Sequence, residues 1–289
     1  MTFVGFSMWS FSDAIIRHLK DNPTIHVAFI AGLGAIITVI VCAPLLGGFR
    51  DTIFLPKLRL RLLRGVILSF SNLMAFITFA NLEMAPAYAI IFIIPVAAKI
   101  LSVIMMKESI SARSWFISGL GFLGVLIVVR PGMVPMGIGS IAAFLLVLGF
   151  SIGQVMTRWI GKEHQTLMSM AGFQYALTAI MLGLYIIMRG EVIQMSVIDM
   201  AWSGLIGALC IFGALLVSNA YACHPAAHIA PVQYTQMLWG ISLGALLFGE
   251  YPDMWTLVGA AVIIVSGLLL LRSSARAKKR TDKIAIKPL

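Results

Sequence analysis

Long apolar runs, separated by short polar joints, occupy most of the chain. An α-helix rises about 1.5 Å per residue and the hydrocarbon core of a bilayer is about 30 Å thick, so about 20 apolar residues make one crossing. The pattern therefore predicts an all-α polytopic membrane protein with ten transmembrane helices. The predicted spans run approximately over residues 2–19, 25–47, 64–81, 84–106, 112–130, 137–158, 166–188, 200–222, 225–248 and 254–272.

Two acidic and two basic residues mark an internal repeat. Glu108 follows one apolar run and Arg130 closes the next, and the same order recurs with Glu250 and Arg272. The Glu and the Arg are 22 residues apart in both copies. The repeated unit is therefore a pair of membrane spans, and such a duplication is typical of transporters.

The number of spans in each half determines how the halves are related. Five spans precede the second half, and because five is odd, the second copy must enter the membrane inverted relative to the first. We expect residues 1–131 and 132–272 to form two inverted five-helix repeats, followed by a basic cytoplasmic tail at residues 273–289. Such duplications place the substrate near the bilayer midplane, and rocking one half against the other gives alternating access.

Composition supports the membrane assignment and excludes other classes. The chain has 60% hydrophobic and 11% charged residues, whereas soluble domains carry about 25% charged residues. The net charge of +10 does not indicate nucleic acid as a partner, because 16 of the 21 Lys and Arg residues fall on one side of the predicted spans. The positive-inside rule makes that side cytoplasmic and places both termini there. Attraction to anionic lipid explains the basic tail.

The residues that often carry metal or catalytic chemistry do not form a known site. Cys42, Cys210 and Cys223 form no close-spaced pair. His224 and His228 have a spacing that metal sites use, but no acidic or cysteine arrangement completes a zinc site. The sequence has no nucleophile elbow, phosphate-cradling loop or second intramembrane Asp. We therefore expect no bound metal, no cofactor and no enzymatic activity.

Three residues of the first span share one helix face. Trp9, Asp13 and Arg17 are spaced four residues apart, so Asp13 can pair with Arg17. We expect this span to be retained rather than cleaved as a signal, because the charges interrupt its apolar stretch. Asp13 lies about 9 Å of helix rise inside the span and is costly to leave facing lipid, which favours a binding or gating function. Arg17 is close enough to the end to anchor the helix at the interface.

Two further ionisable residues are candidates for substrate binding or coupling. Lys99 lies about 10 Å from the cytoplasmic end of its span, so we expect it to face a cavity; snorkelling helped by helix tilt is the alternative. His228 could titrate within the pathway, because histidine changes charge near physiological pH, or cap a helix at the interface. Asp13 could bind a proton, but a uniporter could use the same pair as a gate.

Polar side chains are more numerous within the spans than lipid-facing helices tolerate. Some must line a cavity, and others could only join helices. Gln233, Tyr234 and Trp239 are favoured as lining residues, because they follow Pro231, where the backbone loosens. The further candidates for substrate binding are Asn72, Gln154, Gln174 and Tyr175. Two small-residue motifs, Gly149 with Gly153 and Gly240 with Gly244, allow close helix approach.

Three segments resemble the EamA type of the drug/metabolite transporter superfamily. They are FSMWSFSDAIIRHL, IIPVAAKILSVIMMKESISARSWFISGLGFLGVLIVVRPG and APVQYTQMLWGISLGALLFGEYPDMWTLVGAAVIIVSGLLL. The resemblance covers residues 2–272 and implies ten helices in two inverted halves, a bacterial inner membrane, and export or uptake of small metabolites. Similar sequences are labelled as carriers of S-adenosylmethionine, riboflavin, or amino acids and their derivatives.

The chain departs from this resemblance at two positions. Related sequences often have an Arg soon after a Phe in the second span, where this chain has Phe29-Ile30-Ala31, and often a small or hydroxyl residue where Lys99 stands. We therefore hypothesise that Lys99 supplies part of the buried positive charge that this Arg provides in related sequences.

The predicted function is a secondary transporter that moves a small polar or amphipathic metabolite by alternating access. Aromatic side chains near the charged candidates suit a flat ring. Two alternatives stay open at this point. A non-transporting membrane scaffold would use the polar residues only to join helices, and a flippase for lipid-linked substrates would need a lateral opening lined by basic residues.

Overall fold

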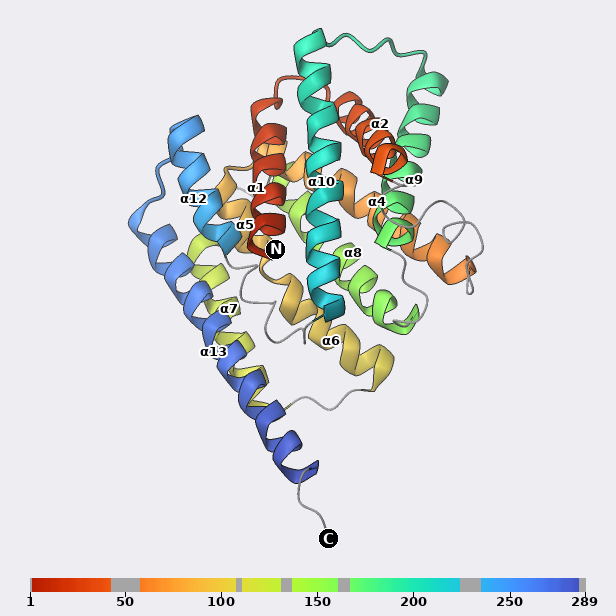
Figure 1. The fold of residues 1–289 in the computed structure, drawn as a ribbon. Helices are drawn as coiled ribbons and strands as arrows, with labels where there is room; N and C mark the ends of the chain where they lie inside the picture. Colours follow the sequence, from red (N-terminus) through yellow and green to blue (C-terminus); the bar gives the residue numbers. More distant parts are fainter. Residues whose placement is uncertain are drawn as a thin grey trace.

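The computed structural model describes residues 2–42, 58–107, 111–130, 137–160, 167–223 and 235–285 (Figure 1). Within these residues every regular element is an α-helix. The helices are α1 (Thr2–His18), α2 (Thr24–Cys42), α4 (Leu58–Asn81), α5 (Met84–Ile91), α6 (Ile94–Met106), α7 (Ala112–Val129), α8 (Ile138–Ile160), α9 (Leu167–Arg189), α10 (Val197–Cys223), α12 (Thr235–Phe248) and α13 (Met254–Ala285).

The helices fall where the apolar runs predict them. Among the described residues, six stretches are long and apolar enough to cross a membrane. They are Thr24–Cys42, Arg59–Asn81, Met84–Met105, Ile138–Thr157, Gly172–Arg189 and Val197–Val217. Shorter apolar helices occur at Trp115–Val129, Thr235–Phe248 and Met254–Leu269. The prediction of an all-α polytopic membrane protein is confirmed, and the inverted relation of the two halves stays a prediction.

Several predicted boundaries differ from the observed ones; α4, for example, begins at Leu58, ahead of the span predicted at 64–81. The span predicted at 84–106 is divided into α5 and α6 by a turn at Phe92 and Ile93. Pro95 lies in the first turn of α6, a position where its missing N–H leaves no helical hydrogen bond unmade. The last helix also runs on to Ala285, past the end of the span predicted at residue 272.

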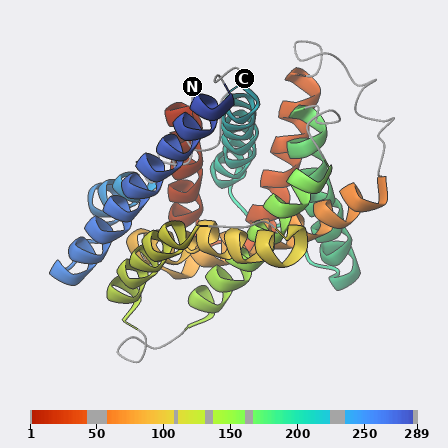
Figure 2. The same cartoon turned by 90° about the horizontal axis from the view of Figure 1, so that it is seen from below.

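The helices pack against one another side by side. The most extensive contacts join α7 to α13, α4 to α8, α2 to α10 and α1 to α10. Figure 1 shows α1 and α10 in the middle of the bundle, with α13 on one flank and α2 and α9 on the other, and Figure 2 shows the same order from below. The predicted seam is present, because Gly149 and Gly153 of α8 lie against Ser71 and Leu68 of α4.

Helix α5 lies in the core of the bundle. Seven of its eight residues, including Met84, Ala87 and Tyr88, are buried. By contrast, large apolar side chains such as Phe116, Ile187 and Leu246 are exposed on the outer helices. Because lipid tails are as apolar as these side chains, their exposure fits a membrane-facing surface.

Ion pairs gather at the end of the bundle where α1 terminates, which we call the Arg17 end. They join Arg17 to Glu250, Arg130 to Asp253 and Arg189 to Glu191, and the His26 ring lies 3.4 Å from the same Glu191. These residues lie at helix ends or in joints that the predicted spans place on the same side of the membrane. The alternation of helix directions deduced from span counting is therefore consistent with these contacts.

Candidate functional site

A carboxylate and a phenol meet inside the bundle. Tyr88 of α5 donates its hydroxyl proton to Oδ2 of Asp13 on α1, with an O to O distance of 2.7 Å. The Tyr88 ring is enclosed by Phe79 and Phe92, whose ring centroids lie 5.4 and 6.2 Å away. Gly240 of α12 lies against the same ring. No Lys, Arg or His of the described residues forms an ion pair with Asp13.

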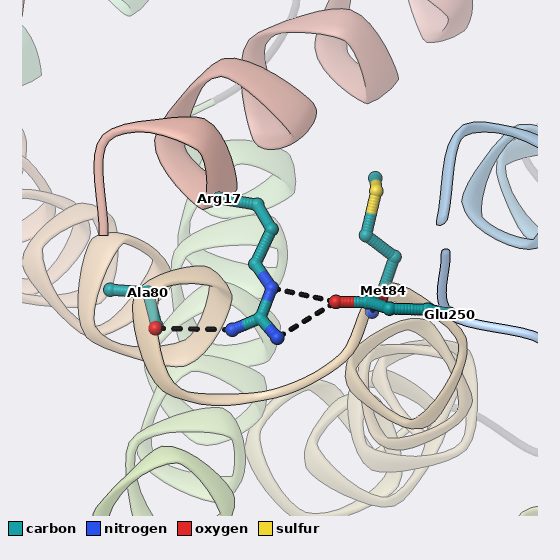
Figure 3. Close-up of polar contacts among 4 residues, drawn as sticks. All are labelled: Arg17, Ala80, Met84 and Glu250. Carbon is teal, nitrogen blue, oxygen red and sulfur yellow. Dashed lines mark hydrogen bonds and ion pairs between the residues drawn. The ribbon is translucent and has the colours of Figure 1, made fainter. Parts of the chain in front are cut away.

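The predicted pair between Asp13 and Arg17 is not formed, and this is a correction. Arg17 instead contacts Glu250 through Nε and Nη2, at 2.8 and 2.7 Å from Oε1, and its Nη1 donates to the Ala80 carbonyl at 3.2 Å (Figure 3). The physical reason is reach: the long Arg17 side chain extends toward the helix end, where a carboxylate from another segment is available, while the shorter Asp13 meets Tyr88. Arg17 is therefore more than an interface anchor.

A polar chain connects α1 to α10 and α9. Trp9 donates its indole N–H to the backbone carbonyl of Cys210 at 3.2 Å. The Cys210 thiol lies 3.5 Å from the Ser12 hydroxyl. Tyr175 shares side-chain hydrogen bonds with Cys210 and Gln174. Two predicted site residues of α9 thus lie in one network with the residue next to Asp13.

The network reaches α4 through Gln174. The Ser69 hydroxyl donates to the Gln174 backbone carbonyl at 2.7 Å. Asn72 lies one helical turn further along α4, is only 6% exposed, and its Nδ2 has no hydrogen-bond partner among the described residues. An unpaired buried amide costs free energy, about 1 to 3 kcal/mol, so this donor is available to a ligand or a water molecule.

Aromatic rings pack along α1. Trp239 of α12 lies 6.2 Å from Phe3 and 5.3 Å from Phe11, measured between ring centroids. Trp9 packs edge-on against Phe6 at 5.6 Å. Of the two predicted tryptophans, Trp9 therefore lies on the helix that carries Asp13, and Trp239 packs against that helix from α12.

The other predicted site residues are placed apart or lie outside the described part. Lys99 of α6 donates to the Ser118 hydroxyl of α7 at 2.6 Å, and it forms no ion pair with Asp13 within the described residues. Gln154 is exposed on α8. His228, Gln233 and Tyr234 lie outside the described residues. The roles of all these residues stay predictions.

Sequence reasoning missed two partners in the site. Tyr88 sits in an apolar run, and its hydroxyl was the only signal that it needed a hydrogen-bond partner inside the bundle. Glu250 marks the internal repeat in the sequence, but its pairing with Arg17 was not predicted. Among the described residues there is no cluster of three or more His, Cys, Asp or Glu side chains that could hold a metal ion.

Two matches to one family model decide the classification. The model of the EamA-like transporter family matches residues 1–130 and again residues 137–272. The chain belongs to the EamA-like transporter family. This family is part of the drug/metabolite transporter superfamily, as the resemblance of the three sequence segments implies.

Curated relatives and a solved structure agree with this membership. An uncharacterised transporter of Helicobacter pylori J99 is 25% identical over 78% of this chain and 74% of its own length. An S-adenosylmethionine uptake transporter of Rickettsia conorii is 24% identical over 94% of this chain and 91% of its own. Mouse solute carrier family 35 member G1 is 25% identical over 86% and 72%. A crystal structure with 15% identity matches 96% of both chains with a TM-score of 0.68, which shows the fold alone.

Proposed function

We propose that this EamA-like protein is a secondary carrier that moves a small cationic or zwitterionic metabolite across the membrane by alternating access. The single observation that carries the proposal is Asp13, an acidic side chain inside the bundle, which within the described residues accepts a hydrogen bond from the neutral Tyr88 hydroxyl and has no basic partner. A carboxylate at membrane depth is costly unless a charge or several donors compensate it. A positively charged group of the substrate would supply that compensation.

The surroundings of Asp13 favour a substrate with a flat ring. Trp9 lies one turn before Asp13 on α1, Trp239 packs against α1 from α12, and an aromatic face attracts both cations and other rings. The unpaired amide of Asn72 offers a donor for a carbonyl, carboxylate or ring nitrogen. S-adenosylmethionine, the substrate named for several relatives, combines a sulfonium, an amino acid group and a purine, so it heads the panel of candidates. Amino acid derivatives and flavins complete the panel.

The orientation and the coupling are parts of the same proposal. The distribution of Lys and Arg supports a location in a bacterial inner membrane with both termini cytoplasmic. We propose that Asp13 exchanges a proton for the substrate cation, because one carboxylate cannot hold both. A reporter fused to the C-terminus would test the orientation, and dependence of flux on an imposed pH gradient would test the coupling.

The decisive experiment is counterflow in liposomes that contain the purified protein. Labelled S-adenosylmethionine outside should accumulate against unlabelled compound inside, with saturation, and Asp13→Asn should reduce the initial rate at least tenfold. Asp199→Asn is the matched control, because Asp199 lies in the first turn of α10, at the bundle end. Saturable flux in the control and its loss in Asp13→Asn supports the proposal.

The opposite results have defined meanings. If no member of the panel shows saturable flux or thermal stabilisation with folded protein, the carrier proposal for this class of metabolite is wrong, and a scaffold gains support. If labelled lipid-linked sugar exchanges between leaflets instead, the protein is a flippase.

The thermal shift expected from a weak ligand is small. A bound ligand raises the free energy of unfolding by RT ln(1 + [L]/Kd), so a ligand with a millimolar Kd, tested at about 10 mM, adds only about 1.4 kcal/mol.

A further inference from the structure

The carboxylate of Glu250 joins three segments at the Arg17 end of the bundle. One oxygen, Oε1, accepts from Nε and Nη2 of Arg17 at 2.8 and 2.7 Å (Figure 3). The other oxygen, Oε2, accepts the backbone N–H of Met84, the first residue of α5, at 2.9 Å. A carboxylate at a helix N-terminus is stabilised by the unpaired N–H groups there. Glu250 therefore holds the end of α1 against the start of α5.

The pair is enclosed and comes from both halves of the chain. The side chains of Arg17 and Glu250 are only 14% and 10% exposed. Arg17 lies within the first family match and Glu250 within the second. Glu250 is fixed by its own turn, because its N–H donates to the Gly244 carbonyl at 3.0 Å and Gly249 has a φ of +66°, which favours glycine. The contact is thus a defined link between the halves.

The link lies one helical turn from the candidate site on three helices at once. On α1, Asp13 precedes Arg17 by four residues, and on α5, Tyr88 follows Met84 by four. On α12, Gly240 lies against the Tyr88 ring, while Gly244 faces Glu250 and Met84. Residues four apart share a helix face. The same helices are therefore joined by two contacts, one above the other. The inner contact joins Asp13 to Tyr88, and the outer contact joins Arg17 to Glu250 and Met84.

We infer that the Arg17–Glu250 pair is the gate at this end of the carrier, and that its opening is coupled through α1 and α5 to the contact between Asp13 and Tyr88. This inference rests on the proposed function. For the end to open, α1 must leave the joint between α12 and α13, so the ion pair must break and both charges must be rehydrated. A substrate that binds Asp13 in place of Tyr88 breaks the inner contact between α1 and α5. Less free energy is then needed to break the outer contact between Arg17 and Glu250.

The native thiol of Cys210 provides a test of the gate that needs no substrate. Cys210 lies 3.5 Å from Ser12, beside Asp13. In a background with Cys42→Ala and Cys223→Ala, its labelling by a membrane-impermeant maleimide applied at the Arg17 end reports access to the site. We expect Glu250→Gln to raise the labelling rate about tenfold, and the charge swap of Arg17→Glu with Glu250→Arg to lower it again only in part, because the swap restores the ion pair but leaves no acceptor for the Met84 N–H.

The matched control removes a neighbouring ion pair and leaves the gate intact. Asp253→Asn breaks the contact with Arg130 in the same joint but touches neither Arg17 nor Glu250, so labelling should not change. Equal labelling in Glu250→Gln and the background, or an equal rise in Asp253→Asn, would overturn the gate. If Glu250→Gln does not fold, a disulfide between Arg17→Cys and Glu250→Cys replaces it: reductant-reversible loss of Cys210 labelling supports the gate, and unchanged labelling overturns it.

A double-mutant cycle tests the coupling separately. Tyr88→Phe removes the inner contact with Asp13 without altering Arg17 or Glu250, and we expect it to raise Cys210 labelling by about threefold. If the two contacts are coupled, the double variant with Glu250→Gln labels no faster than Glu250→Gln alone, because the outer contact is already broken. Multiplicative effects, or no effect of Tyr88→Phe, would overturn the coupling. Since labelling needs no transport, a gate that opens in a protein without flux would refute only the proposed function.

Discussion

The Tyr88 hydroxyl donates to Oδ2 of Asp13 across 2.7 Å, and this contact joins a buried half-length helix to the first helix of the chain. It gives the interior carboxylate one neutral donor. The residues that surround the contact come from both family matches, so substitutions in either half of the chain should alter this hydrogen bond.

Removing the Tyr88 hydroxyl should destabilise the protein. A hydrogen bond to a charged group contributes about 1.5 to 3 kcal/mol, and Tyr88→Phe loses it while keeping the buried ring. We expect a lower midpoint of thermal unfolding in detergent. Tyr185→Phe is the control, because Tyr185 is exposed on α9 and should unfold like the original protein. Identical midpoints for all three proteins would show that the contact contributes nothing to stability.

Adding a methyl group at Gly240, in the second half of the chain, should disturb the contact between Tyr88 and Asp13. A Cβ there would overlap the Tyr88 ring, and that ring is almost fully enclosed. Overpacking of this kind costs about 1 to 3 kcal/mol, so Gly240→Ala should unfold earlier and lose affinity for the transported ligand. Gly119→Ala on α7 meets no atom within 4 Å and serves as the control. A Gly240→Ala protein with unchanged stability and unchanged binding would contradict this prediction.

The crossing of α2 and α10 offers a pair of glycines with opposite predicted effects. A Cβ at Gly34 would run into the backbone of Gly204, whereas a Cβ at Gly204 would meet nothing within 4 Å. Gly34→Ala should therefore destabilise by about 1 to 3 kcal/mol. Gly204→Ala should stabilise by up to about 1 kcal/mol, because Ala favours the helix. Thermal unfolding of the two variants in the same detergent decides the matter, and equal shifts would exclude a close crossing.

Stability should depend on Asp253 in a defined pH range. The hydroxyl and backbone N–H of Thr256 and the Arg130 guanidinium lower the pKa of Asp253 to about 2. An unperturbed Asp has a pKa of about 3.9. Because the folded pKa is the lower one, the ionised form stabilises the fold above about pH 4, and this contribution is lost as the pH falls toward 2.

Comparison of Asp253→Asn with the original protein checks this pH dependence. The unfolding midpoint of the variant should be lower by the same amount at pH 7 and pH 5, and the two proteins should converge as the pH falls to about 2. Asp21→Asn, in an exposed turn, should show no such difference. A gap that widens as the pH falls would have the wrong sign for a carboxylate with a lowered pKa.

The location of the helices could be predicted because it depends on local sequence. Each apolar run predicts one bilayer crossing, and counting the crossings along the chain predicts on which side of the membrane each joint lies. The division between α5 and α6 was missed because a Pro in an apolar run fits either a kink or a new helix start. At the site, Asp13, Gln174, Tyr175 and Trp9 were found because polar groups inside apolar runs stand out.

Sequence by itself determined that this is a duplicated, all-helical membrane protein with an acidic group inside its first span, because run lengths and charge positions are properties of the linear chain. Only the tertiary structure decided the partners. Arg17 lies four residues from Asp13, yet it pairs with Glu250, 233 residues away, and Asp13 bonds to Tyr88, 75 residues away. The physical reason is that helical spacing shows only which side chains share a face. The arrangement of α1, α5 and the joint between α12 and α13 in space determines which donor or acceptor each face meets.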